Sequence, residues 1–265
     1  MWKFDTETAV TRINDTLWRG HISAAWNIGD NPNGGYLLSV ALRALQAALP
    51  HPDPVSVTTH YLRPGSPDQP CDIEVEVLRV GKTLSTARAT LIQGDKARLE
   101  LLTVFGDLAQ SVGIEQEITI AAPEIPSPED CMARDGDSQG ITLPIAERLD
   151  TRLDPASAMP GKSNKAELNG WNRFQDLRAP DSICLPLFCD TFPPSPFALL
   201  GNVGWVPTIE LTVHVRRKPQ PGWLQARFSC DDLSQGRMIE TGQLWDSSGQ
   251  LVAQSRQIGL VMNAN

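Results

Sequence analysis

Residues 33–49, NGGYLLSVALRALQAAL, decide the fold of this 265-residue chain. Their apolar positions recur at helical spacing and cover most of the circumference of a helix. Between residues 37 and 49 only three polar residues interrupt that surface: Ser39, Arg43 and Gln46. A helix that is apolar nearly all round has to be enclosed by other elements. Pro50 ends it, because proline lacks the N–H that a continuing helix requires. The stretch therefore predicts a buried helix that the rest of the chain wraps.

Four segments of strand-like sequence follow the helix and are separated by short turns. They span residues 55–61, 72–77, 84–93 and 97–105. In the second, Ile73, Val75 and Val77 alternate with acidic residues, the period of two that marks a half-buried strand. Short turns between consecutive strands imply antiparallel neighbours. Ahead of the helix, residues 5–28 predict a short lead-in and a hairpin. We expect an antiparallel sheet around the helix.

The same order of elements returns in the second half of the chain. Ala25-Trp26-Asn27 recurs as Gly170-Trp171-Asn172, each ahead of an apolar segment. A second helix is predicted over residues 182–192. Strands are predicted over residues 208–216, 223–230, 237–245 and 251–262. A plan that recurs at this interval indicates a tandem duplication.

The segment between the halves has a different composition. Residues 109–144 are rich in proline and acidic residues and follow neither period, so they predict a connector across the surface. We therefore divide the chain into an N-terminal repeat, residues 1–108, the connector, residues 109–144, and a C-terminal repeat, residues 145–265. The predicted fold class is α+β, with a long central helix wrapped by an antiparallel sheet in each repeat.

Several stretches resemble the acyl-CoA thioesterase II family. In the first half these are Gly34-Gly35-Tyr-Leu-Leu, Tyr61-Leu-Arg-Pro-Gly65 and the segment EVLRVGKTLS that starts at Glu76. In the second half, Cys189-Asp190, Pro207-Thr208-Ile209 and Arg256-Gln257 resemble the places where that family keeps an Asp, a Thr and a Gln around one water. The resemblance implies a double hotdog fold and hydrolysis of an acyl-CoA thioester, with Asp190, Thr208 and Gln257 as the catalytic residues.

The residues themselves leave more than one interpretation open. Asp190 stands in an apolar segment, and burying a carboxylate there costs several kcal/mol unless it is hydrogen-bonded. It either caps a backbone turn near the prolines or acts as a general base with a raised pKa. Thr208 is an ordinary β-branched residue at the start of a strand, and Gln257 faces either a ligand or solvent. The first helix carries no acid, so we expect one site per chain.

Three residues of the first half are predicted to bind substrate. Gly34 and Gly35 let a ligand or a neighbouring backbone approach the first turn of the helix, where N–H groups can stabilise an oxyanion. Arg63 is a candidate for the phosphates of coenzyme A, as is the cluster at residues 216–218. A solvated strand end explains either basic site equally well.

Two rivals to thioester hydrolysis remain. A hotdog-fold enoyl-CoA hydratase or dehydratase shares the buried-helix architecture, but it needs an Asp and a His that act together. The first helix has neither, and His60 is the only histidine on the strands of that repeat. The other rival is a non-catalytic protein that binds acyl-CoA or an acyl carrier, and exposure of Asp190 to solvent would favour it.

The composition of the chain limits which classes of partner and cofactor are expected. A formal net charge of −8 argues against a general nucleic-acid binder. The sequence has neither a signal-peptide pattern nor an apolar run near the roughly 18 residues that span a bilayer, so we expect a cytoplasmic protein without a membrane partner. The five cysteines lack CxxC spacing and predict buried thiols, and no metal or redox cofactor is expected. Exposed sheet edges favour a homodimer or higher homo-oligomer.

Overall fold

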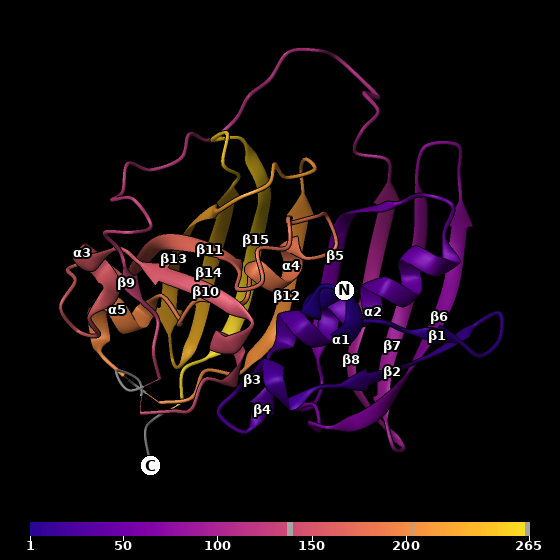
Figure 1. Cartoon of the computed structure of the whole chain (residues 1–265), viewed down its shortest axis with the longest axis horizontal. Coiled ribbons are helices and arrows are strands. Elements are labelled where there is room, and N and C mark those ends of the chain that lie inside the picture. Colours follow the sequence, from indigo (N-terminus) through magenta and orange to yellow (C-terminus); the bar gives the residue numbers. More distant parts are fainter. Residues whose placement is uncertain (137–139, 203, 263–265) are drawn as a thin grey trace.

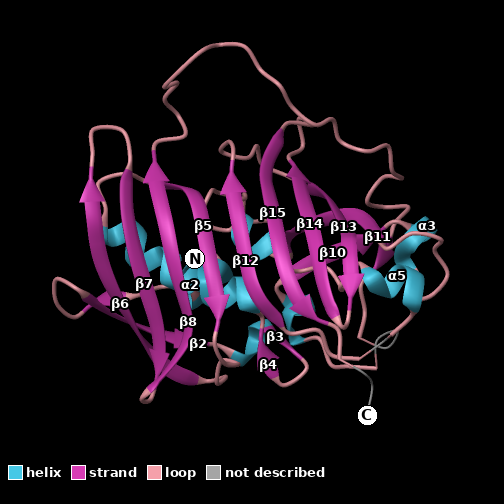
Figure 2. Cartoon of the chain, turned by 180° about the vertical axis from the view of Figure 1, so that it is seen from behind, coloured by secondary structure: helices cyan, strands magenta, loops and turns pink. Residues whose placement is uncertain are grey.

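A large antiparallel sheet dominates the molecule (Figures 1 and 2). In this computed structural model, which describes residues 1–136, 140–202 and 204–262, the sheet has 13 strands. The helices lie on one of its faces, and Figure 2 shows the opposite face uncovered by any helix. No helix in these described ranges is long and apolar enough to cross a membrane.

The first half runs to residue 106. Its elements are α1 (Lys3–Glu7), β1 (Thr11–Arg12), β2 (Leu17–Ile22), η1 (Ala24–Trp26), β3 (Asn27–Ile28), β4 (Asn31–Pro32), α2 (Gly34–Ala48), β5 (Asp53–Tyr61), β6 (Gln69–Val80), β7 (Ser85–Gln93) and β8 (Lys96–Gly106). All four predicted strands and the hairpin are present, with Trp18 and Ile22 of β2 buried in the core.

The rest of the chain supplies the other half of the sheet. Its elements are β9 (Met132–Ala133), η3 (Pro144–Glu147), β10 (Leu149–Leu153), α3 (Pro155–Ala158), β11 (Glu167–Phe174), α4 (Leu185–Phe188), α5 (Pro196–Leu200), β12 (Thr208–Val215), β13 (Leu224–Ser234), β14 (Arg237–Trp245) and β15 (Leu251–Leu260). The four strands predicted for this half are β12 to β15.

The strand order reads alike from both sides of its central pair. The order is β1-β2-β6-β7-β8-β5-β12-β15-β14-β13-β11-β10-β9. From β5 outward the first half therefore follows the same path as the second half does from β12. Strands β5 and β12 pair antiparallel, with Thr58 opposite Thr212 and a 3.0 Å hydrogen bond between their hydroxyls. This pairing joins the two halves into one continuous sheet.

The long helix α2 confirms the prediction from residues 33–49. The Asn33 side chain caps its first turn by accepting a hydrogen bond from the Tyr36 N–H, and Leu49 ends it. Residues 35–42 are all buried, as an all-round apolar sequence requires. The helix packs on β5, β6 and β7 on one side and on α4 on another. Its enclosure by both halves fixes the position of its N-terminus.

The second long helix was predicted wrongly. Within residues 182–192 the structure has only the four-residue α4 (Figure 1), and Cys189 is its C-cap. Pro193 explains the early end, because a proline in a continuing helix would lose a hydrogen bond and clash with the carbonyl four residues earlier. The Trp26 and Trp171 echo does not mark equivalent positions either, since Trp26 lies in η1 and Trp171 in β11.

The segment predicted as a connector crosses the surface, largely exposed, and is tied to the C-terminal half by hydrogen bonds. The Trp171, Gln225 and Trp245 side chains donate to the carbonyls of Pro126, Pro123 and Ile120, in that order. Two indole donors and one amide donor thus hold the connector against three neighbouring strands, β14, β13 and β11. Its last part reaches the cavity described below, where Arg134 and Ile141 are among the lining residues.

Candidate active site

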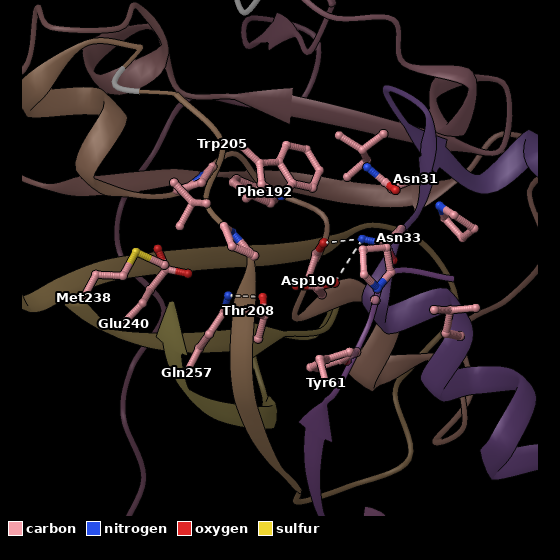
Figure 3. A pocket seen from close by; sticks show the side chains of 18 of the residues that line it. Asn31, Asn33, Tyr61, Asp190, Phe192, Trp205, Thr208, Met238, Glu240 and Gln257 are labelled. Carbon is pink, nitrogen blue, oxygen red and sulfur yellow. Dashed lines mark hydrogen bonds between the residues drawn. The ribbon is translucent and has the colours of Figure 1, made fainter. Parts of the chain in front are cut away.

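A cavity of about 600 Å³ opens where the two halves meet. Its walls come from the N-terminus of α2, the end of β5, the turn after α4, and strands β12, β14 and β15 (Figure 3). The lining is mostly apolar, with a few polar groups that converge on one region, the usual construction of a small-molecule site.

Asp190 lies at the centre of this region, in the turn that follows α4. The carboxylate oxygen Oδ2 accepts a hydrogen bond from the Gly35 N–H at 2.8 Å and another from Asn33 Nδ2 at 3.0 Å. Asn33 Nδ2 also donates to the backbone carbonyl of Asp190 at 2.7 Å. The N-terminus of α2, in the first half, therefore holds the acid of the second half. A helix N-terminus favours negative charge at this position.

Two opposing effects set the acidity of Asp190. Burial raises its pKa to about 6, whereas the Gly35 N–H, the Asn33 amide and the Arg134 charge act to lower it. The side chain is only partly exposed, and it lines the cavity. At pH 7 the carboxylate is mostly ionised and still basic enough to take a proton from water.

Gly35 lies where only a glycine fits. A Cβ atom at this position would stand 2.8 Å from Leu187 Cα and 3.0 Å from the Leu187 carbonyl. The close neighbour expected from the sequence is thus the backbone of α4. Gly34 lines the cavity, and a Cβ there would meet Tyr61 and Asp190. Because the Gly35 N–H already binds Asp190, it is engaged in this structure, and substrate binding by the two glycines stays a prediction.

Thr208 and Gln257 lie together on the floor of the cavity. Gln257 Nε2 donates to Thr208 Oγ1 at 2.6 Å, between the neighbouring strands β15 and β12. Gln257 is 8% exposed and faces the cavity, not bulk solvent. Asp190 lines the same cavity, although within the described residues neither side chain hydrogen-bonds to it directly (Figure 3). The structure therefore brings the three predicted residues to one space.

The two predicted basic sites differ in position. Arg63 lines the cavity mouth, is exposed, and donates to the Ala97 carbonyl at 3.1 Å. Arg217 and Lys218 instead form ion pairs with Glu117 and Asp53, and they are not among the cavity-lining residues. Of the two, only Arg63 can meet a ligand in the cavity.

Tyr61 is a cavity residue whose role the sequence did not indicate. Its hydroxyl is buried and has no hydrogen-bond partner in the described part of the chain. Burial raises its pKa well above the usual value, and the charges of Asp190 and Glu210 add to that effect. The group is therefore a neutral hydroxyl close to Asp190.

Two further charged residues were also missed. Arg134 lines the cavity and donates to the Thr191 carbonyl, although it comes from the predicted connector, where no periodic pattern marks any residue. Glu240 lies on β14 and is 6% exposed. For Glu240 a signal existed, because Met238 and Leu244 share its parity on the strand and indicate that its side chain faces inward.

Comparison with known proteins places the chain among thioesterases. The acyl-CoA thioesterase N-terminal domain matches residues 22–107, and the acyl-CoA thioesterase C-terminal domain matches residues 128–261. A solved structure from Thermobifida fusca YX, provisionally described as a thioesterase II, is 32% identical, with 98% of each chain covered and a TM-score of 0.88. A hotdog-fold protein of unknown function from Alicyclobacillus acidocaldarius is 22% identical, with both chains fully covered and a TM-score of 0.85.

A dehydratase is a more distant likeness. The dehydratase domain of RzxB from Pseudomonas fluorescens is 14% identical, covers 92% of this chain and 93% of its own, and has a TM-score of 0.60. The two domain models together match most of the chain, which therefore belongs to the acyl-CoA thioesterase family. Family membership supports thioester hydrolysis as the general activity.

Proposed function

We propose that the protein hydrolyses acyl-CoA thioesters to the free acid and coenzyme A, with a water held by Asp190, Thr208 and Gln257. The observation that carries the proposal is the shared cavity, in which an ionised Asp190 on the α2 N-terminus faces the Thr208–Gln257 pair. These groups are suited to hold one water and to take its proton as it attacks a carbonyl.

In the proposed step, the water attacks the thioester carbon while the cavity residues orient it and take its proton. The Gln257 amide donates to Thr208, which leaves its own oxygen and the Thr208 hydroxyl hydrogen available to orient the water. The water oxygen bonds to the thioester carbon and gives its proton to Asp190. Collapse of the tetrahedral intermediate breaks the C–S bond, and the leaving thiolate takes the proton from Asp190, which returns the carboxylate to its ionised form. Arg63 at the cavity mouth is placed to meet the phosphates of coenzyme A.

Thiol release from acyl-CoAs of graded chain length tests this proposal. Gln257→Leu should lower kcat at least tenfold, because the water loses one of its partners. Gln254→Leu is the matched control, since Gln254 lies on the same strand with its side chain on the opposite face and outside the cavity lining. Equal turnover in the two variants would remove Gln257 from the mechanism.

We also propose that the Tyr61 hydroxyl, which has no partner among the described residues, donates a hydrogen bond to the thioester carbonyl. Tyr61→Phe should lower kcat roughly tenfold and leave the free protein as stable or slightly more stable, because a buried hydroxyl without a partner is destabilising. Kinetics and thermal unfolding of the same samples check both effects. A fall in Tm alongside the fall in kcat would instead assign Tyr61 a structural role.

The two rivals make different predictions. A hydratase or dehydratase of this fold needs a histidine, and among the described residues that line the cavity there is none. A binding-only protein would show affinity for acyl-CoA without release of thiol. Wild-type protein that binds the whole series and releases no thiol would therefore replace hydrolysis by binding.

Two features of organisation are also proposals. The mirrored strand order supports a double hotdog that arose by duplication, with units at residues 1–108 and 145–265. Assembly into a homodimer or higher homo-oligomer and a cytoplasmic location remain expectations from the sequence. Sedimentation of the purified protein would decide the first of these.

A further inference from the structure

Glu240 is a buried acid that the proposed hydrolysis does not use. It lies directly opposite Gln257 in the register of β14 and β15, and both side chains line the cavity (Figure 3). Residues opposed in this way have Cβ atoms about 4.5–5.5 Å apart. Glu240 therefore lies one strand away from the Thr208–Gln257 pair, on the side remote from Arg63 and Tyr61.

Apolar and polar groups surround Glu240. Met238, two residues away on β14, lines the cavity beside it (Figure 3), and the charges of Asp190 and Asp231 add to the effect of burial on the pKa of Glu240. The Ser195 N–H donates to Oε2 at 2.8 Å, and within the described ranges no cation forms an ion pair with the carboxyl group. Burial raises the pKa of Glu240 to about 7, so its neutral and ionised forms are both present near neutral pH. Among the described residues only Ser195 hydrogen-bonds to this carboxyl group, which therefore has capacity left for a hydrogen bond to a ligand.

The position of Glu240 relative to the reaction centre indicates which ligand atom it meets. Arg63 is an exposed residue of the cavity lining, and Met238 and Phe228 line the same cavity. With the coenzyme phosphates at Arg63, as proposed above, an acyl chain laid along the cavity would pass Gln257 before it reached Glu240. One strand spacing of about 4.8 Å corresponds to roughly three or four bonds along an acyl chain. A second carboxylate on the chain would be repelled by Asp190 and Glu240.

We propose that Glu240 selects acyl groups that carry a hydroxyl within a few bonds of the thioester, and that hydroxyacyl thioesters are the preferred substrates. This inference rests on the proposed thioester hydrolysis. A hydroxyl can donate to the ionised carboxyl group or accept from the neutral one, so it pairs with Glu240 in both forms. A site that hydrogen-bonds a substrate hydroxyl discriminates against the analogue that lacks it, because the polar group is then left unpaired.

The test compares 3-hydroxyacyl-CoA with the unsubstituted acyl-CoA of the same chain length. Wild-type protein should show a kcat/KM at least about tenfold higher for the hydroxyacyl substrate. Glu240→Leu should lower this ratio about tenfold, and Glu240→Gln, which keeps a hydrogen-bonding head, should restore most of it. Ile239→Leu, which alters the neighbouring residue on the opposite face of β14, is the matched control and should keep the wild-type ratio.

Several outcomes would overturn the inference. A wild-type ratio near one does so without any variant, even if Glu240→Leu fails to fold. If a 3-aminoacyl-CoA is preferred over the hydroxyacyl-CoA, the group that Glu240 recognises is an ammonium group and not a hydroxyl, which contradicts the proposal. If no acyl-CoA releases thiol, the proposed hydrolysis is wrong. The acyl preference is then measured separately, by calorimetry of binding with the thioether analogues of the same two substrates. Equal affinities for the two analogues would end the proposal for Glu240.

Discussion

Asp190→Asn should lower kcat for thiol release from an acyl-CoA by about a thousandfold and leave the fold intact. The expected size follows from general-base catalysis, which contributes roughly 10²–10⁴ in rate. An asparagine can still accept the hydrogen bonds from Gly35 and Asn33 through its carbonyl oxygen, so the turn after α4 is preserved. Only the capacity to take a proton is lost.

The same variant has a second effect, on stability. An acid whose pKa is raised in the folded state, here from 3.8 to about 6, stabilises the fold below pH 4 relative to higher pH. That stability is lost as pH rises from about 4 through 6. Asparagine does not ionise, so the variant does not lose this stability as pH rises. It should therefore become more stable than wild type by roughly 1–3 kcal/mol above pH 6. Denaturant unfolding at pH 4 and pH 8 measures the difference.

Asp232→Asn is the control for both measurements, because Asp232 is exposed and outside the cavity lining. It should match wild type in turnover and in the pH dependence of stability. If Asp190→Asn kept wild-type turnover, another group would have to supply the base. Wild-type kcat/KM should also rise with pH through about 6 and then level off, and a profile flat from pH 5 to 8 would contradict the role of Asp190.

Gly35→Ala should destabilise the protein by about 2–4 kcal/mol and lower kcat/KM more than tenfold. The added methyl would stand 2.8 Å from Leu187 Cα and 3.0 Å from Asp190 Cβ, so the backbone of α4 has to move. Helix propensity alone would make the alanine variant more stable by about 1 kcal/mol, so a net loss of stability has to come from the steric clash. For a chain of this size we expect Tm to fall by roughly 5–10 °C.

Gly113→Ala is the matched control for the glycine variant. Nothing lies within 4 Å of a Cβ at Gly113, which is in the exposed segment between the halves. Its Tm and kcat/KM should equal those of wild type. A Gly35→Ala protein with unchanged Tm would mean that α2 and α4 are less closely packed than the structure indicates.

The sequence predicted most of the architecture because its strongest signal was also its most buried element. An all-round apolar helix requires enclosure, and α2 is enclosed. The prediction of a second long helix was wrong, because residues 182–192 have the apolar composition of a buried helix but are followed by prolines at residues 193 and 194. In the structure the helix ends at Phe188, ahead of these prolines, and Asp190 lies in the turn that follows.

The site was predictable only in part. Asp190 was predicted as a site residue because it is the one acid in an apolar segment, and in the structure it lines the cavity. Arg134 had no such signal, since a residue in an aperiodic segment is placed by tertiary contacts alone. The roles of Tyr61 and Glu240 depend on which side chains lie across from them in the sheet, and strand register is a property of pairing that no single strand encodes.

The hydrogen bond from the Gly35 N–H to Asp190 makes each half dependent on the other. A single half cannot hold Asp190 in this way, because the donors and the acid are more than 150 residues apart in the chain. Substitutions at the start of α2 should therefore appear in kinetic experiments as defects of a residue encoded far downstream. Selection on either half thus acts on both.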